Sequence, residues 1–192
     1  MTTMKQTCLA FALVLAAACG PTSTPPPAAP EPPAGGDAAS EPSGGGAERT
    51  PVTSFQIEDN KLVLPAPIVF TTDSLDVNAS EAALWYIHDY LVAKDYVTLL
   101  RLEGHGDQPG EDAMMFTGGQ ALAVGEWLVA HGIDCKRLVA VAFGDTKPVA
   151  DPSTPEGRAQ NRRIEVVNAE LRGRAIGGMP TDGGGVAAKV CD

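Results

Sequence analysis

The stretch RLEGHGDQPGEDAMMFTGGQALAV, residues 101–124, decides the fold. Its first residues belong to an apolar run that starts at Val97, and a short run of this kind predicts a strand. Its second half carries apolar residues at helical spacing, which predicts a helix from about Asp112 to His131. The four residues between them, Gly-His-Gly-Asp at 104–107, lie where the strand ends. A strand, a polar loop and a helix in this order indicate an α/β unit.

Further strands and helices alternate on both sides of this stretch. We expect a hairpin around Asp59-Asn60, a strand at 67–70, a helix at 78–96, a strand at 138–143, a short helix at 158–162 and a strand at 164–167. Asn78 or Ser80 is the expected cap of the first helix. This alternation predicts an α/β two-layer sandwich, a mixed β-sheet with helices on one face, over residues 52–171. Residues 172–192 are expected to be a loose, glycine-rich tail.

Gly118 and Gly119 interrupt the helix predicted over 112–131. Each glycine disfavours a helix interior by roughly 1 kcal/mol relative to alanine. The pair therefore indicates either a close approach of another element to this turn or a later start of the helix.

Residues 1–18 have the composition of an export signal. Lys5 is their one charge, and the apolar run that follows is shorter than the ~20 residues that span a bilayer. The run ends in Leu15-Ala-Ala-Ala-Cys19-Gly, which resembles the lipobox of bacterial lipoproteins, although the leucine lies four residues before the cysteine rather than three. The resemblance implies that Cys19 carries the lipid, such as palmitate, that anchors the chain in the outer membrane. The alternative is an ordinary signal cleaved after Ala18.

Residues 19–51 are expected to be the lipidated cysteine and a linker rich in proline, alanine and glycine. Between Gly20 and Thr50 there is no aromatic residue and no aliphatic side chain larger than alanine, so nothing there can form a core. At about 3.1 Å per residue in the polyproline II form, the linker spans at most roughly 90 Å. This composition is typical of a tether.

Charge and cysteine content narrow the function further. The 192 residues carry a net charge of −10, which argues against nucleic acid as a partner. If Cys8 leaves with the signal and Cys19 carries lipid, Cys135 and Cys191 remain in an oxidising compartment, where two such thiols often pair. We expect a disulfide that fastens the tail, with two unrelated thiols as the alternative.

Five short motifs resemble the OmpA-like C-terminal domain family, which includes the peptidoglycan-associated lipoproteins. They are Phe70-x-x-Asp73-Ser74, Gly104-His105-x-Asp107-x-x-Gly110, Gly132-Ile133, Gly144-Asp145-x-x-Pro148 and Asn161-Arg162-Arg163-Ile164-Glu165. The resemblance covers about residues 54–171 and implies no catalysis, no cofactor and no metal. It implies a lipid-anchored, periplasm-facing protein that binds the diaminopimelate of the peptidoglycan stem peptide non-covalently and so tethers the outer membrane to the cell wall.

The resemblance also implies where this ligand binds. The aspartate at the position of Asp107 receives the ammonium group of diaminopimelate, an arginine on the following helix takes its carboxylate, and an arginine of the Asn-Arg-Arg motif supports the site. We choose Arg162 for that support because strand alternation puts Arg163 on the same face as Glu165. The further candidates are Asp73 and Asn161. A zwitterion needs a fixed anion and a fixed fork of donors, which arginine supplies.

Three positions depart from the family pattern: Gly106 stands where threonine is usual, Ala113 where asparagine is usual, and the third is the arginine that grips the ligand. The helix motif Leu-Ser-x-x-Arg-Ala corresponds to residues 116–121, so Gln120 stands where the arginine is usual. Hydrogen bonds to charged groups contribute about 1.5–3 kcal/mol against roughly 1 for neutral pairs, so we expect about ten-fold weaker binding. The alternative function is therefore a module with weakened or lost wall binding that acts as an interaction component among envelope proteins.

His105 and Asp107 allow two other interpretations. An imidazole and a carboxylate suit zinc, but no third ligand is evident, because His88 and His131 are expected on helices. Acid–base catalysis lacks a serine or cysteine nucleophile in a recognisable turn, which leaves a metal-assisted wall hydrolase as a third class. We favour His105 as a ring packed beneath the site.

Overall fold

The structure is a computed structural model that describes residues 49–71 and 74–191. These residues belong to one compact unit, Gly46–Asp192. The expected signal, the lipidated Cys19, nearly all of the linker and Asp73 lie outside the described residues. Within the described part of the chain, no helix is long and apolar enough to cross a bilayer.

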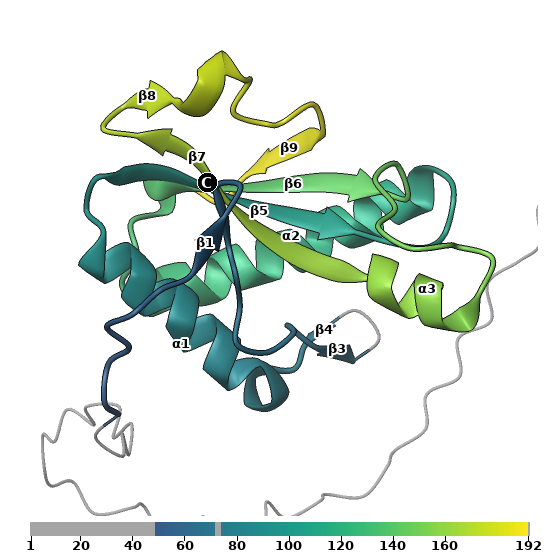
Figure 1. Cartoon of the computed structure of the whole chain (residues 1–192), viewed down its shortest axis with the longest axis horizontal. Coiled ribbons are helices and arrows are strands. Elements are labelled where there is room, and N and C mark those ends of the chain that lie inside the picture. Colours follow the sequence, from purple (N-terminus) through teal and green to yellow (C-terminus); the bar gives the residue numbers. More distant parts are fainter. Residues whose placement is uncertain (1–48, 72–73, 192) are drawn as a thin grey trace, which may run out of the picture. The chain divides into compact units, whose positions relative to one another are not determined.

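Strands and helices alternate through the unit (Figure 1). The strands are β1 (Ile57–Glu58), β2 (Lys61–Leu62), β3 (Phe70–Thr71), β4 (Ser74–Leu75), β5 (Val97–His105), β6 (Leu138–Gly144), β7 (Arg163–Leu171), β8 (Arg174–Ala175) and β9 (Val186–Lys189). The helices are α1 (Val77–Ala93), α2 (Glu111–Ala130) and α3 (Pro155–Asn161), and two 3₁₀ turns are η1 (Cys135–Arg137) and η2 (Ile176–Gly178).

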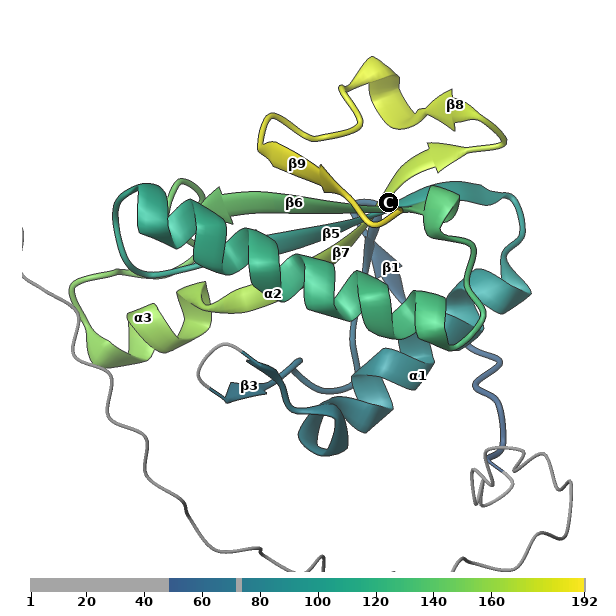
Figure 2. The same cartoon turned by 180° about the vertical axis from the view of Figure 1, so that it is seen from behind.

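The main sheet has the strand order β1-β2-β7-β5-β6-β9, and β8 pairs with β7 beside this path. β5 and β6 are parallel, whereas β7 runs antiparallel to β5 and β9 antiparallel to β6. α1 and α2 lie against one face of the sheet, as both views show (Figures 1 and 2). The predicted mixed sheet and α/β fold are thus confirmed. The strand expected at 67–70 is wrong, because β3 begins only at Phe70 and pairs with β4 outside this sheet.

The core lies between the sheet and the two long helices. Its largest fully buried side chains include Leu84 and Ile87 of α1, Leu128 of α2, and Leu100 and Leu102 of β5. Burying each aliphatic side chain of this size contributes about 1.5–3 kcal/mol. Because side chains alternate along a strand, the odd-numbered residues of β5 from 101 to 105 point to the face opposite the helices.

The cap of α1 differs from the prediction. The helix begins at Val77, and the Asp76 carboxylate caps it by accepting a hydrogen bond from the Ala79 amide at 3.0 Å. Ser80, one of the two expected caps, is instead buried inside the first turns. Its hydroxyl accepts a hydrogen bond from the Val69 amide at 2.8 Å and so ties the preceding segment to the helix.

The glycine pair of α2 has two different explanations. The helix continues unbroken from Glu111, so a later start is wrong. A Cβ atom on Gly118 would lie 3.3 Å from the Cβ of Ala142 in β6, which is the close approach that the pair indicated. A Cβ atom on Gly119 would meet nothing within 4 Å, and nothing in the structure explains this glycine.

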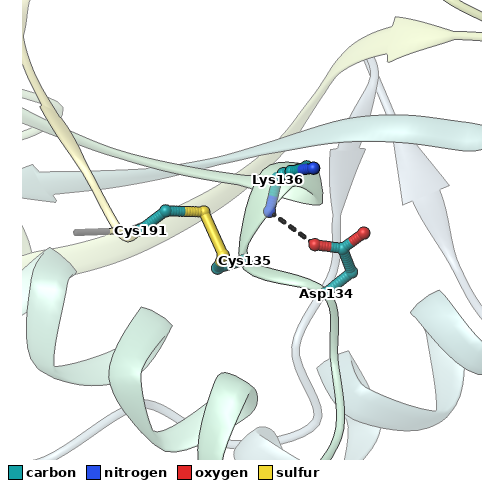
Figure 3. Close-up of a disulfide and its surroundings, with 4 residues drawn as sticks. All are labelled: Asp134, Cys135, Lys136 and Cys191. Carbon is teal, nitrogen blue, oxygen red and sulfur yellow. Dashed lines mark hydrogen bonds between the residues drawn. A yellow bond between two sulfur atoms is a disulfide. The ribbon is translucent and has the colours of Figure 1, made fainter.

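The C-terminal tail is not loose, which corrects the expectation for residues 172–192. Its strand β9 extends the sheet along β6, with Ala142 opposite Val186 and Val139 opposite Lys189. Cys135 of η1 and Cys191 are joined by a disulfide with an S–S distance of 2.09 Å (Figure 3). The tail therefore belongs to the folded unit and is fastened to it at both the strand and the disulfide.

Candidate binding site

The loop that carries Asp107 is fixed by close contacts of β5 with α2 and β6. A Cβ atom on Gly104 would lie 2.0 Å from the Thr117 carbonyl oxygen, so only glycine lets β5 approach α2 this closely. The Gly106 amide donates to the Gly144 carbonyl at 2.7 Å, which ties the loop to the end of β6. Gly104 and Gly106, the glycines on either side of His105, thus fix the position of the loop that carries Asp107 relative to α2 and β6.

Thr117 joins the same three elements from the helix side. Its buried hydroxyl donates to the Ala113 carbonyl at 2.8 Å and accepts from the Gly144 amide at 3.2 Å. Both polar roles of the hydroxyl are therefore satisfied inside the protein, as a buried hydroxyl requires. These bonds link the first turns of α2 to the end of β6 beside the loop.

A pocket of about 390 Å³ opens between this loop, α2 and the start of β7. It brings together Asp107, Gln120 and Arg162, three of the residues predicted to bind the ligand. The Arg162 Nη1 donates to the Asp107 Oδ2 at 2.6 Å. The Asp107 side chain is 7% exposed, whereas 53% of the Arg162 side chain is exposed. A carboxylate and a guanidinium thus face the same small cavity.

A second hollow of about 370 Å³ continues the pocket towards β3. The two share Phe116, Gln120 and Arg162, and the second adds Val69 and Phe70. Phe116 is 41% exposed and gives the groove an apolar wall. The site can therefore bind a ligand that has charged groups on an aliphatic stem.

The other predicted residues lie elsewhere. Asp73 is outside the described residues. Asn161 is buried, and its amide oxygen accepts from the Val149 and Ala150 amides at 2.8 and 3.0 Å while its nitrogen donates to the Ala150 carbonyl at 3.0 Å. Its side chain holds the loop before α3 rather than facing the pocket. Asn161 therefore positions its neighbour Arg162.

His105 is packed beneath the site, 2% exposed and stacked on Phe143 with a centroid distance of 5.2 Å. Among the described residues, the group of potential metal ligands contains His105 with Glu103 and Glu165 but not Asp107. The pairing of His105 with Asp107 on one zinc ion therefore finds no support in the geometry.

The sequence profile of the OmpA family matches residues 69–162. These residues form an OmpA family domain. The match contains the Asp107 loop, the whole of α2 and Arg162, so every residue that lines the pocket of about 390 Å³ lies inside the OmpA family domain. The predicted resemblance is confirmed.

Several known proteins are similar to part of this chain. The outer membrane porin F of Pseudomonas aeruginosa is 43% identical over 79 residues, which are 39% of this chain and 23% of the porin. The peptidoglycan-binding protein ArfA of Mycobacterium tuberculosis is 35% identical over 68 residues, 34% of this chain and 21% of ArfA. The crystal structure of the peptidoglycan-associated lipoprotein from Burkholderia pseudomallei has 27% identity and a TM-score of 0.47, covering 53% of this chain and 86% of that one. The matches thus span less than a quarter of these two curated relatives.

An ion pair that the sequence did not reveal fastens the segment before the OmpA family domain. Arg49 donates two hydrogen bonds, both at 2.6 Å, to the two oxygens of Asp89 on α1, and the Val52 amide donates to the same carboxylate at 2.7 Å. The hydrogen bonds from Arg49 hold the pKa of Asp89 well below its usual range, although burial opposes this shift. In the sequence Asp89 is one polar residue on a helix, with nothing to separate it from a solvated acid.

Proposed function

We propose that the protein is an outer-membrane lipoprotein whose OmpA family domain binds peptidoglycan non-covalently and tethers the outer membrane to the cell wall. The observation that carries the proposal is the Asp107 carboxylate paired with the Arg162 guanidinium in one pocket. The similarity to a protein named for peptidoglycan binding supports the same conclusion.

The ligand is the diaminopimelate residue of the stem peptide. Its ammonium group binds the Asp107 carboxylate, whose Oδ1 atom is left over from the bond between Oδ2 and Arg162. Its carboxylate binds the exposed part of the Arg162 guanidinium and the Gln120 amide. The aliphatic stem lies along Phe116, which lines the same groove.

The remaining regions supply the tether. Residues 1–18 are the export signal, Cys19 carries the lipid, and the linker up to about residue 51 extends from the membrane to the domain at 52–171. The similarity to an outer membrane porin supports a location in the envelope. Metabolic labelling with palmitate tests the anchor: the intact chain incorporates label, and Cys19→Ala does not. Label retained by Cys19→Ala refutes lipidation at this residue.

Wall binding is tested by sedimentation of the chain from Gly20 onward with purified sacculi. Asp107→Ala should abolish pelleting. Asp95→Ala is the matched control, because it removes the same charge from an exposed loop before β5, at the opposite end of that strand. Equal pelleting by Asp107→Ala and Asp95→Ala refutes the assigned pocket.

Gln120 decides how strong the binding is. Gln120→Arg adds a charged donor and should strengthen pelleting about ten-fold, since charge-assisted bonds exceed neutral ones by roughly 1 kcal/mol or more. Gln120→Glu has almost the same shape as the native side chain and should weaken it, because a second carboxylate repels the ligand carboxylate. Gln120 favours the second candidate function, an envelope interaction module with weakened wall binding. That candidate is supported if the native chain stays soluble with sacculi while Gln120→Arg pellets.

A further inference from the structure

The sheet face opposite α1 and α2 carries two carboxylates directly across from each other. In the antiparallel register of β5 and β7, Glu103 lies opposite Glu165. Like charges in this arrangement destabilise a sheet unless a cation lies between or beside them. Glu103 is buried and Glu165 half-buried, so solvent screens them little. Arg101, Arg163 and Lys61 already lie beside the two carboxylates and offset this repulsion.

His105 is next to this pair and has unsatisfied ring nitrogens. Its side chain is 2% exposed, and neither Nδ1 nor Nε2 makes a hydrogen bond within the described structure. The Nε2 atom lies 3.3 Å from the Glu103 Oε2 without forming a hydrogen bond. A buried polar group left unpaired costs about 1–3 kcal/mol, so a native imidazole in this state indicates a missing partner.

We propose that Glu103, His105 and Glu165 form a binding site for a divalent transition metal ion, with Zn²⁺ as the best match. One ligand atom from each of the three residues lies within 4.8 Å of the others. Tetrahedral zinc with bonds of about 2.0–2.1 Å has ligand atoms separated by roughly 3.3–3.4 Å. The separation of the His105 Nε2 and Glu103 Oε2 atoms already equals that edge, and Glu165 closes the site by a small side-chain movement.

The surrounding arginines orient the two carboxylates for this role. The Arg101 Nε donates to the Glu103 Oε1 at 2.6 Å, and the Arg163 Nε donates to the Glu165 Oε1 at 2.7 Å. Each bond fixes one oxygen and leaves Oε2 of the same carboxylate to bind the ion. Hydrogen bonds of this kind to the outer oxygen are a usual support of carboxylate ligands.

Lys61 is the competitor for the site. Its Nζ lies 2.5 Å from the Glu165 Oε2, and its side chain is 49% exposed. The ion therefore takes the place of an ammonium group that can swing into solvent. The site borders a hollow of about 330 Å³, which gives access and room for a water molecule as the fourth ligand. An imidazole in the set favours zinc, nickel or copper over magnesium or calcium.

Zinc binding is tested on the chain from Gly20 onward, which keeps the compact unit 46–192 whole. Zn²⁺ is titrated against a chromogenic chelator, and Co²⁺ replaces it for absorption spectra of the coordination geometry. We expect one ion per chain and a tetrahedral Co²⁺ spectrum. His105→Gln and Glu165→Gln should each weaken the affinity at least ten-fold. Lys61→Met should strengthen it several-fold because the competing ammonium group is gone.

Two comparisons keep the test sharp. Lys61→Met predicts tighter binding, a change that damage to the fold cannot produce. The double variant His88→Gln/His131→Gln removes the other two histidines of the sequence, which lie outside this cluster, and should leave the affinity unchanged. The proposal is overturned if the native chain binds no zinc, if His105→Gln binds it as the native chain does, or if the His88→Gln/His131→Gln double variant loses it.

Discussion

Asp89 and Asp107 each accept a hydrogen bond of 2.6 Å from an arginine, but the two carboxylates differ in how many of their oxygens the arginine occupies. Asp89 bonds Arg49 through both oxygens and also accepts from the Val52 amide. Asp107 bonds Arg162 through one oxygen and borders an open pocket. At the scale of single residues, the first acid has both oxygens bonded inside the protein, whereas the second keeps one oxygen without a bond to Arg162 beside the pocket.

The Asp89 pair predicts a pH dependence of stability. Because Arg49 lowers the pKa of Asp89 in the folded protein, the charged carboxylate stabilises the fold fully above its unfolded pKa of about 3.9. This contribution is lost as the pH falls below that value towards the lowered folded pKa. Hydrogen bonds to charged groups contribute about 2 kcal/mol to the free energy of unfolding, and we expect this contribution from the Arg49–Asp89 pair. In urea denaturation at pH 6, Asp89→Asn should reduce the free energy of unfolding by about this amount.

The same variant should lose less stability than the native protein when the pH falls from 6 to 3. Asp95→Asn serves as the control, because Asp95 is exposed in the loop after α1, and it should behave as the native chain does. An Asp89→Asn curve parallel to the native curve between these pH values would contradict the assigned ion pair.

At the scale of elements, α2 meets the sheet through residues without side chains. Gly104 of β5 and Gly118 of α2 both face atoms that a methyl group would press against, whereas Gly119 faces open space. The distance between the helix and the β5–β6 pair is thus set by glycine, and the pocket beside Asp107 depends on it.

A matched pair of substitutions tests this contact. Gly104→Ala should reduce the free energy of unfolding by about 3 kcal/mol or more, because its Cβ would overlap the Thr117 carbonyl. Gly119→Ala should increase it by up to about 1 kcal/mol, since alanine favours the helix and meets nothing. Urea denaturation of both variants measures the free energy of unfolding, which should fall for Gly104→Ala and rise for Gly119→Ala. Equal effects would show that the spacing of helix and sheet is not fixed at Gly104.

The elements that the sequence predicts well are those whose pattern is local. The hairpin is confirmed, with Asp59 and Asn60 at positive φ in its turn, and so are β5, α2, β6 and the Arg163–Glu165 alternation of β7. β9 has no local signal, since Val-Ala-Ala-Lys after three glycines is a weak strand former and acquires its order from the edge of β6. The motifs singled out Asp107, Gln120 and Arg162, which line one pocket, but no motif pairs Glu103 with Glu165, because strand register decides that contact.

At the scale of the whole molecule, the C-terminal segment adds the last strand to the sheet and is fastened to the folded unit. The disulfide joins residues that are 56 apart in sequence. Val190, next to Cys191, packs closely on α2, because a Cβ atom on Gly125 would lie only 2.9 Å from its side chain. The strand before it covers the edge of β6 and becomes the outer strand of the sheet.

Removal of this disulfide should lower stability without affecting the pocket. For a loop of this length the chain-entropy estimate is about 4 kcal/mol, and measured losses for native disulfides are typically about 2–5 kcal/mol. We expect Cys135→Ser/Cys191→Ser, or the native chain with a reductant, to lose about this much in urea denaturation. Hydrogen exchange of β9 should accelerate more than that of β5, while sedimentation with sacculi stays the same. Unchanged β9 exchange after reduction would contradict the fastening role.

The clamp between Arg49 and Asp89 also has a mechanical consequence. If the preceding chain is a tether under tension, the load enters the folded unit at Arg49 and reaches α1 through the Asp89 carboxylate before it reaches any strand. The force at which the first residues detach from the domain is then set by the Asp89 side chain on α1. The sheet and its pocket keep their shape while these first residues unfold.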